Sequence, residues 1–244
     1  MSEVGRIVEE YRRRAVEIPA QRYSPASFAQ VFQRQTREWH TLCLLDEAEA
    51  LPLAGKRVLD IGCGSGAWLA EFEGWGVPRE RLYGIDLLDE RVTAARRRLG
   101  CLAGPEGASA GADIRRGDAT ALPWVSESFD IVTQSMVFSS ILDPAMRRGV
   151  ASEMARVAAP SGVIVWYDFA LTNPHNPHLR RVTRSELRRL FPGFEVASVR
   201  TTLAQPLTRR FVRHARAAAV FLEHLRFLNS HTLALLTRAP TEAG

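Results

Sequence analysis

The sequence predicts an α/β protein built on a doubly wound parallel sheet, with helices on both faces. Strand-like and helix-like patterns alternate five times between residues 57 and 168, which is the order that produces parallel strands joined by helical crossovers. The strand-like runs at 57–61 and 129–133 are short and apolar, as expected for strands buried on both faces. With 244 residues, of which 46% are hydrophobic, the chain can bury the core of one large domain.

The first 54 residues differ from the rest and are expected to form a helical cap. Apolar residues recur there at helical spacing, with arginine and glutamate between them. Pro52 and Gly55 end this pattern, so we place the boundary between a cap at 1–54 and a main domain at 55–244. The residues expected to form the apolar stripe of the cap are Phe28, Val31, Phe32, Trp39, Leu42 and Leu45.

In the main domain, the element order follows from the change between strand and helix patterns. Strands are expected at 57–61, 81–86, 113–116, 129–133 and 162–168. Helices are expected at 67–73 and 88–99, and Pro144 opens another at its tolerated first turn. Residues 100–111, rich in Gly, Ala, Ser and Pro, predict a surface loop. The last third predicts a strand at 194–203, a helix at 208–228 and a strand at 231–237.

Composition and charge exclude several classes of protein. The formal net charge is +5, but it comes from arginine, since Lys56 is the only lysine. The arginine runs lie in helical patterns and indicate solvated faces, so no nucleic-acid partner is expected. Cys43, Cys63 and Cys101 are too widely spaced for a disulfide framework or a zinc site, and we expect no metal. No apolar run approaches the roughly 18 residues of a membrane span. We expect a cytoplasmic monomer or homodimer.

Three glycines follow the strand predicted at 57–61, in the stretch Asp60-Ile61-Gly62-Cys63-Gly64-Ser65-Gly66. Glycine permits positive φ angles and lets the backbone approach a ligand closely. The helix that follows offers free N–H groups to an anion. Gly62, Gly64 and Ala67 also satisfy the dinucleotide-binding pattern GxGxxA. A nicotinamide or flavin enzyme therefore stays open at this point, as does a tight turn without a ligand.

Two acidic residues end the next two strands. Asp86 lies about twenty residues after the glycines, where a carboxylate accepts hydrogen bonds from ribose hydroxyls, although a helix N-cap is an alternative. Asp118 and Ala119 follow the third strand, where an acceptor binds an adenine amine and a neighbouring N–H reaches a ring nitrogen. Asp118 alone is a common kind of turn residue. The ordered set of three strand ends predicts an adenosine-containing ligand at this edge of the sheet.

These stretches resemble the successive motifs of class I S-adenosylmethionine (SAM)-dependent methyltransferases. The resemblance covers residues 55–168 and rests on Val58 to Gly66, Gly84-Ile85-Asp86, Gly117 to Pro123 and Phe129 to Val132. It implies a seven-stranded Rossmann-like sheet with a terminal antiparallel hairpin, and SAM, converted to S-adenosylhomocysteine (SAH), across the first four strand ends. The resemblance implies that Gly62, Gly64 and Gly66 border the methionine moiety, Asp86 the ribose, and Asp118 with Ala119 the adenine. It also implies that Asp60 organises the loop and that Gln134 and Ser135 face the methionine moiety and the acceptor. Cys63 and Leu87 are expected to belong to the cofactor-binding residues as well.

Departures from subfamily patterns narrow the choice of acceptor. The fourth strand is followed by Gln134-Ser135-Met136-Val137 and not by Asn-Pro-Pro-Tyr, which disfavours methylation of nucleic-acid amines. No cysteine lies near that strand end, which removes the covalent mechanism of cytosine C5 methylation. A recognisable Tyr-x-x-x-Lys pair is lacking, which disfavours an oxidoreductase. A small-molecule acceptor is expected, and a non-catalytic SAM-binding partner of another enzyme stays open.

The acceptor is expected to bind beside a substrate loop at about 169–182, after the fifth strand. Two Asn-Pro pairs stiffen this polar segment. Arg37 of the cap is expected to pair with the carboxylate of SAM. A loose resemblance over 166–238 to methyltransferases of bacterial glycan and secondary-metabolite genes implies a sugar or secondary-metabolite hydroxyl, with C- and N-methylation as alternatives. The candidate general bases are His175, His178, Tyr167 and Asp168.

Overall fold

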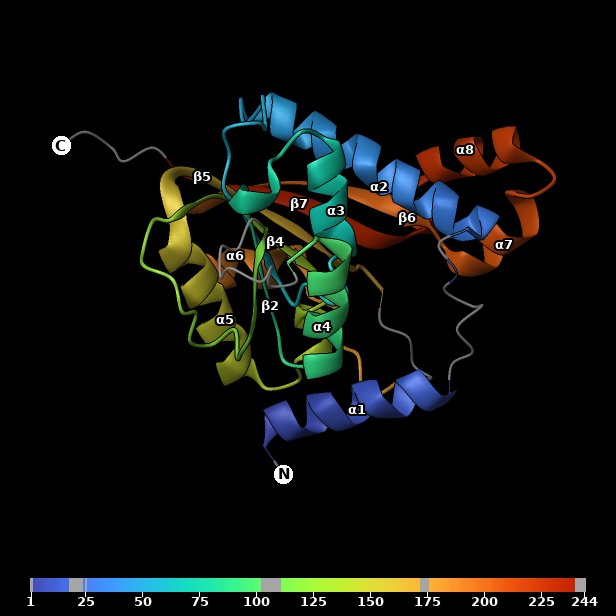
Figure 1. The fold of residues 1–244 in the computed structure, drawn as a ribbon. Coiled ribbons are helices and arrows are strands. Elements are labelled where there is room, and N and C mark those ends of the chain that lie inside the picture. The colour runs from blue at the N-terminus through green and yellow to red at the C-terminus, as the bar shows by residue number, and fades with distance from the viewer. Residues whose placement is uncertain (1, 18–23, 25, 102–110, 172–175, 240–244) are drawn as a thin grey trace.

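The computed structural model describes residues 2–17, 24, 26–101, 111–171 and 176–239. Strands of these residues form one seven-stranded sheet in the order β3-β2-β1-β4-β5-β7-β6, with helices on both faces (Figure 1). The predicted doubly wound, seven-stranded fold is confirmed. The strand order reverses between β1 and β4, which is where open sheets of this type bind ligands.

Five parallel strands form the part of the sheet from β3 to β5. They are β1 (Val58–Ile61), β2 (Leu82–Asp86), β3 (Asp113–Arg116), β4 (Phe129–Ser135) and β5 (Ala158–Phe169). Asp60 is in register with Gly84 of β2 and with Thr133 of β4. The carboxyl ends of the three central strands therefore lie side by side, and their terminal residues face the same edge.

Two antiparallel strands complete the sheet. Strand β7 (Asn229–Arg238) lies between β5 and β6 (Phe194–Leu203) and is antiparallel to both. Both strands were expected from alternating patterns, and the predicted terminal hairpin is confirmed. Their register places His231 of β7 beside Phe169 of β5 and Thr201 of β6.

Helices on the two faces of the sheet bury two apolar clusters. On one face lie α2 (Phe28–Glu47), α3 (Ala67–Gly74) and α4 (Asp89–Arg98), and on the other α5 (Pro144–Val157) and α6 (Arg184–Leu190). Helix α5 begins where predicted, because the Asp143 side chain accepts a hydrogen bond from the N–H of Ala145 and Pro144 occupies the first turn. These helices hold the strand ends in fixed positions.

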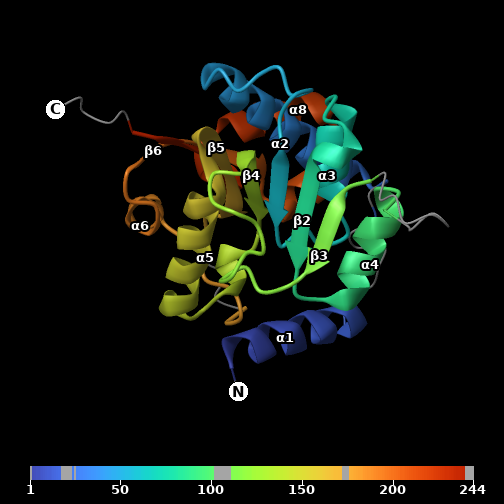
Figure 2. The ribbon, with the colours of Figure 1, turned by 60° about the vertical axis from the view of Figure 1, so that its left-hand side comes forward.

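The two N-terminal helices occupy different places. Helix α1 (Glu3–Glu17) crosses beneath the carboxyl edge of the sheet, whereas α2 runs along one face (Figure 2). Phe32 and Leu45 of the expected apolar stripe are buried, but Phe28 is 64% and Trp39 68% exposed. The periodicity was right about a helix and wrong about these two side chains, because sequence alone does not show which helix faces a neighbour covers.

The single helix expected at 208–228 is wrong. The chain forms α7 (Gln205–Phe211), a turn, α8 (Arg216–His224) and the short 3₁₀ helix η4 (Arg226–Leu228). At the turn the N–H groups of His214 and Ala215 both bond the carbonyl of Phe211. This break turns α8 back beside α7 and the N-terminal part of α2 (Figure 1), where Ala219 and Val212 pack with Phe32. Residues 102–110 of the predicted surface loop lie outside the described residues.

Candidate cofactor site

A cavity lies at the carboxyl ends of β1, β2, β3 and β4, where the sequence predicts a ligand. Its empty volume is about 670 Å³, including the part open to solvent, which suits a ligand of nucleoside size or larger. Most of its wall is apolar. The described residues that line it are Ile7, Tyr11, Ile61, Gly62, Ile85, Asp86, Leu87, Leu88, Arg91, Gly117, Asp118, Ala119, Ser135, Val137, Ser140, Ile141, Met146 and Val150.

The glycine loop between β1 and α3 reaches the cavity wall at Gly62. Gly62, Gly64 and Gly66 have φ angles of +65°, +54° and +71°, in the left-handed region that favours glycine. A Cβ on Gly62 would also lie 2.4 Å from Cγ2 of Val137, in the segment after β4. The N–H of Cys63 bonds the carbonyl of Ile85, which ties the loop to β2. The loop thus leaves a smooth backbone surface beside the cavity.

Asp86 at the end of β2 is buried, and both of its carboxylate oxygens accept backbone hydrogen bonds. Oδ2 accepts from the N–H of Gly64 at 2.9 Å, and Oδ1 from the N–H of Leu88 at 3.0 Å. The side chain lines the cavity and does not cap α4, whose first residue has no side-chain cap. Each oxygen keeps further acceptor capacity. Asp86 therefore fixes the glycine loop and presents two oriented acceptors to the cavity.

Asp118 and Ala119 line the cavity next to Asp86. The Asp118 Oδ1 accepts the N–H of Thr120 at 2.9 Å, which is the turn geometry expected of a lone aspartate. The N–H of Gly117 donates to the carbonyl of Asp86, so the turn after β3 is held against the end of β2. Leu87, also a predicted site residue, lines the same wall.

The segment after β4 is held in an unusual conformation. Met136 has φ +64°, which is uncommon for a residue with a side chain. Strained backbone of this kind clusters at functional sites. The buried Gln134 side chain supports it, since its Nε2 donates to the carbonyl of Tyr167 and its Oε1 accepts the N–H of Val137. Ser135 lines the cavity, whereas Gln134 packs behind it.

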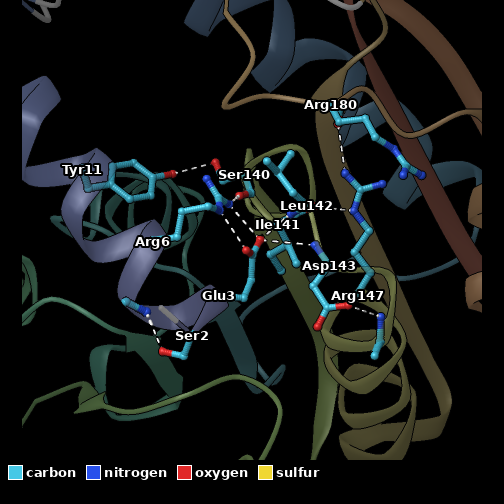
Figure 3. Close-up of polar contacts among 12 residues, drawn as sticks. Ser2, Glu3, Arg6, Tyr11, Ser140, Ile141, Leu142, Asp143, Arg147 and Arg180 are labelled. Carbon is cyan, nitrogen blue, oxygen red and sulfur yellow. Dashed lines mark hydrogen bonds and ion pairs between the residues drawn. The ribbon is translucent and has the colours of Figure 1, made fainter.

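Helix α1 covers the cavity, with Ile7 and Tyr11 in the wall. The Tyr11 hydroxyl lies 3.0 Å from Oγ of Ser140, and the guanidinium of Arg91 lies 4.2 Å from the centre of the Tyr11 ring. The Arg6 Nη2 donates to the carbonyl of Ser140 at 2.6 Å (Figure 3). Sequence reasoning missed Ile7, Tyr11 and Arg91, because their contacts join segments far apart in the chain.

A charged clamp holds the beginning of α1. Glu3 bonds Arg6 and also accepts the N–H groups of Leu142 and Asp143, ahead of α5 (Figure 3). Its hydrogen bond to Arg6 lowers the pKa of Glu3 to about 2. The buried Arg147 braces the same segment, since its Nε donates to the carbonyl of Ile141 at 2.6 Å. Burial lowers the pKa of Arg147.

Arg37 lies between α2 and α3, beyond the glycine loop. It pairs with Glu71, and its guanidinium lies 5.0 Å from the Trp68 ring and 5.7 Å from the Tyr167 ring. Its Nε is buried without a hydrogen-bond partner among the described residues. Nearby, burial raises the pKa of Asp60 to about 7, although Thr133 donates a hydrogen bond to this carboxyl at 2.8 Å. The predicted pairing of Arg37 with a SAM carboxylate stays a prediction.

The three candidate general bases that the structure describes, Tyr167, Asp168 and His178, do not line the cavity. Tyr167 is buried, its hydroxyl lies 2.7 Å from Oγ1 of Thr202, and burial raises its pKa to about 12. Asp168, whose pKa burial raises to about 6, accepts the N–H groups of Ser139 and Phe169. His178 is partly exposed, and its Nε2 lies 3.7 Å from Glu10 of α1. His175 lies outside the described residues, so its role stays a prediction.

The described residues contain no group of three or more His, Cys, Asp or Glu side chains arranged to hold a metal ion. Of their helices, none combines the length and the apolar character required to cross a membrane.

Comparison with known proteins finds a family match over part of the chain. Residues 58–162 match the family described as methyltransferase domain. A demethylmenaquinone methyltransferase of Renibacterium salmoninarum is 32% identical over 159 residues, which is 65% of this chain and 58% of the relative. This chain spans about half the length of the curated relatives that it matches.

Solved structures show the same fold. Magnesium protoporphyrin IX methyltransferase from Synechocystis PCC 6803, with bound SAH, aligns with a TM-score of 0.59 at 15% identity, over 87% of this chain and 86% of that chain. A SAM-dependent methyltransferase of Thermotoga maritima, described as a possible histamine N-methyltransferase, aligns with a TM-score of 0.59 at 16% identity, over 97% of this chain and 99% of that chain. At such identities the likeness establishes the fold.

Proposed function

We propose that this chain, which carries a methyltransferase domain of the class I SAM-dependent superfamily, transfers the methyl group of SAM to a small-molecule acceptor. One observation carries the proposal. The cavity at the strand ends brings together Gly62, Asp86 and Asp118 with Ala119, the positions at which the sequence resembles the superfamily. Their agreement in space follows from the parallel register of the strands.

The residues of the cavity fit SAM. The paired acceptors of Asp86 suit two vicinal ribose hydroxyls, and its backbone hydrogen bonds hold them in place. The apolar wall, which includes Ile85 and Ile141, suits the faces of an adenine. The crowding at Gly62, where a Cβ would meet Val137, leaves room for backbone only. The site thus offers a ribose acceptor, an apolar slot and a bare backbone wall in one cavity.

The contribution of this chain to catalysis is orientation and exclusion of water. When bound, SAM supplies a methyl group that its own sulfonium charge activates. Asp86 and the turn at Asp118 would fix the adenosine end, while the glycine loop would border the methionine end. Tyr11 and Ile7 would close the cavity from below, because α1 is fixed to the segment after β4.

Two acceptor classes follow from different lines of support. The relatives' names point to demethylmenaquinone as an acceptor, and the apolar cavity wall is compatible with a ring of this kind. The loose resemblance of the C-terminal third favours a hydroxyl of a sugar or secondary metabolite. For either acceptor, we propose His178 as the base among the described candidates, because its side chain is partly exposed, whereas Tyr167 and Asp168 are buried.

Isothermal titration with SAM, SAH and NADH tests the cofactor. We expect SAM and SAH to bind with Kd values on the order of 1–100 µM, in the range of common enzyme substrates. Binding of NADH in place of SAM would overturn the proposal. Transfer of labelled methyl from SAM to a demethylated naphthoquinol, compared with transfer to sugar and polyketide hydroxyls, then identifies the acceptor class.

A non-catalytic SAM-binding role is the second candidate. It is favoured by one observation, because no histidine is found among the described residues that line the cavity. In that case the isolated chain would bind SAM, transfer no methyl group to any acceptor tested, and co-purify with a second protein whose turnover requires it. Turnover by the isolated chain would exclude this role.

A further inference from the structure

Exposed apolar side chains gather on one surface of the molecule, away from the cofactor cavity. Of the eight large apolar side chains that are exposed in the described residues, five belong to α2, α8 and η4. These five are Phe28, Trp39, Val220, Phe221 and Phe227, with exposed fractions from 42% to 73%. The other three, Val16, Val125 and Leu171, lie in separate segments. Gathered exposed apolar residues of this kind mark interaction sites.

Helix α8 is apolar on both of its sides. Ala219 and Leu222 face inward and pack with the cluster around Phe32. On the opposite side, Ala217, Val220, Phe221 and His224 are exposed and follow the spacing i, i+3, i+4 and i+7, so they form one stripe. A helix that is apolar all round is normally buried. The exposed stripe of α8 is therefore a face without a partner among the described residues.

Arginines border this stripe. Arg216 and Arg226 line one groove together with Trp39, Val220 and His224. Arg209, Arg210 and Arg213 lie on or just after α7, at the same end of the molecule (Figure 1). None of these five guanidinium groups forms an ion pair with a carboxylate of the described residues.

The one acidic residue of the groove does not neutralise these arginines. Glu223 is turned inward, where its carboxylate accepts hydrogen bonds from Oγ1 of Thr36 at 2.9 Å and from the N–H of Thr202 at 3.0 Å. The surface therefore combines aromatic side chains with unpaired positive charge. We call it the α2–α8 surface, and it comprises Trp39, Arg216, Ala217, Val220, Phe221, His224, Arg226 and Phe227.

The positive charge of the α2–α8 surface indicates which kind of partner can bind it. A second copy of the chain in a twofold arrangement would bring the same arginines face to face, and like charges across an interface oppose association. An anionic surface with an apolar interior satisfies both features, because arginines bind lipid phosphates while aromatic side chains enter the boundary of the acyl region. We propose that the α2–α8 surface docks on an anionic phospholipid bilayer. This inference does not depend on the methyl acceptor.

Co-sedimentation of the full chain with vesicles tests the docking. The probes are vesicles of phosphatidylcholine alone and vesicles of phosphatidylcholine with phosphatidylglycerol in equal parts. We expect binding to the anionic vesicles only, and weaker binding as salt is added. The double variant Arg216→Glu, Arg226→Glu should lower the partition coefficient at least about 25-fold, since each arginine near such a surface contributes about fivefold.

Matched control variants distinguish the effect of the α2–α8 surface on vesicle binding from the effect of the net charge of the chain. Arg97→Glu with Arg98→Glu changes the charge equally on the exposed side of α4 and should bind like the parent chain. Phe221→Ser with Phe227→Ser should weaken binding, whereas Val125→Ser should not.

Trp39 gives a direct readout: its fluorescence should shift to shorter wavelength on anionic vesicles, and Trp39→Phe should remove that shift. Retained SAM affinity shows that each variant is folded.

Four results would overturn the proposal. The first is no binding to anionic vesicles, or equal binding to neutral ones. The second is an equal loss in the Arg97, Arg98 control. The third is binding of a nucleic-acid duplex or polyglutamate through the same arginines without vesicle binding, which would assign the surface to another polyanion. The fourth is a dimer in analytical ultracentrifugation that the Phe221, Phe227 variant dissociates.

Discussion

The carboxyl edge of the sheet and the α2–α8 surface are built in opposite ways. At the edge, Asp86, Asp118 and Gln134 all have backbone partners, and glycines with positive φ angles bring the chain close to the cavity. On the α2–α8 surface, Phe221 and Arg216 extend into solvent without described partners. The edge is organised before a ligand arrives, whereas the surface gains its contacts only from outside.

This difference predicts different responses to solution conditions. Buried groups at the edge have pKa values shifted by burial, so pH should act mainly there. The exposed arginines interact through water, so salt should act mainly on the α2–α8 surface. Substitutions that lower SAM affinity should cluster at the edge and under α1, and variants of Arg216 and Phe221 should leave that affinity unchanged.

The largest effect is expected from Asp60→Asn. Burial raises the pKa of Asp60 from 3.8 to about 7, so the folded state holds its proton more tightly than the unfolded state. That contribution to stability is present below pH 4 and is lost as the pH rises towards 7. Between pH 5 and 8 the free energy of unfolding of the parent should fall by about 3 kcal/mol relative to the variant, at about 1.4 kcal/mol per pKa unit. Urea unfolding at both pH values measures this, and parallel pH profiles would contradict it.

Asp86→Ala should lower SAM affinity about 100-fold. The variant loses the two charge-assisted hydrogen bonds that the Asp86 carboxylate accepts from the N–H groups of Gly64 and Leu88, so the glycine loop loses its anchor. Titration calorimetry measures this loss. The matched control is Asp89→Ala, an exposed acid three residues later whose partner is Arg116. Equal losses in the two variants would mean that negative charge in the region, and not the position of Asp86, supports binding.

Gly62→Ala should destabilise the chain by about 2 kcal/mol and weaken SAM binding as well. The added Cβ would lie 2.4 Å from Val137, and φ +65° is strained for alanine. Gly55→Ala is the control, since its Cβ would meet nothing within 4 Å. Thermal unfolding with and without SAM separates the two effects, and an unchanged Tm for Gly62→Ala would contradict the packing described.

Glu3→Gln should weaken SAM binding about tenfold, the smallest of these effects, because it loosens α1 without changing the cavity floor. The loss corresponds to about 1.4 kcal/mol, as expected for weakened hydrogen bonds of a charged group. Stopped-flow measurement should place the change in SAM dissociation. Glu17→Gln, at the other end of α1, is the control, and an unchanged dissociation rate in Glu3→Gln would show that α1 does not retain the cofactor.

The difference between local patterns and contacts of distant segments explains which features the sequence could predict. The strand ends with Gly62, Asp86 and Asp118 were placed correctly, because local sequence patterns indicate buried strands and the turns that follow them. The contacts of Tyr11 with Ser140 and Arg91 join segments about 80 to 130 residues apart, and no local pattern encodes such pairings. The expectation of a terminal antiparallel hairpin came from the family resemblance and not from periodicity.

The C-terminal third was harder to predict for a physical reason. Residues 208–228 are rich in Ala, Arg and Leu and contain no Gly or Pro, so propensity favours one long helix. Tertiary packing prevails instead, because the turn at His214 returns α8 to the side of α2. Trp39 and Phe28 show the complementary case, where an apolar residue in a helical pattern stays exposed. Apolar periodicity identifies a helix but not the neighbour that covers it.

The buried thiol of Cys63 can report the opening of the glycine loop. Cys63 is 5% exposed, burial raises its pKa, and a Cβ on Gly84 would lie 2.9 Å from its Sγ, so reagent cannot reach it in the closed loop. Alkylation of Cys63 must therefore wait for the loop to open. Cys43 and Cys101 are less buried and provide an internal reference for the reagent. The labelling rate of Cys63, divided by the rates of Cys43 and Cys101, therefore measures how often the loop opens. Peptide mass spectrometry measures these rates without an engineered probe.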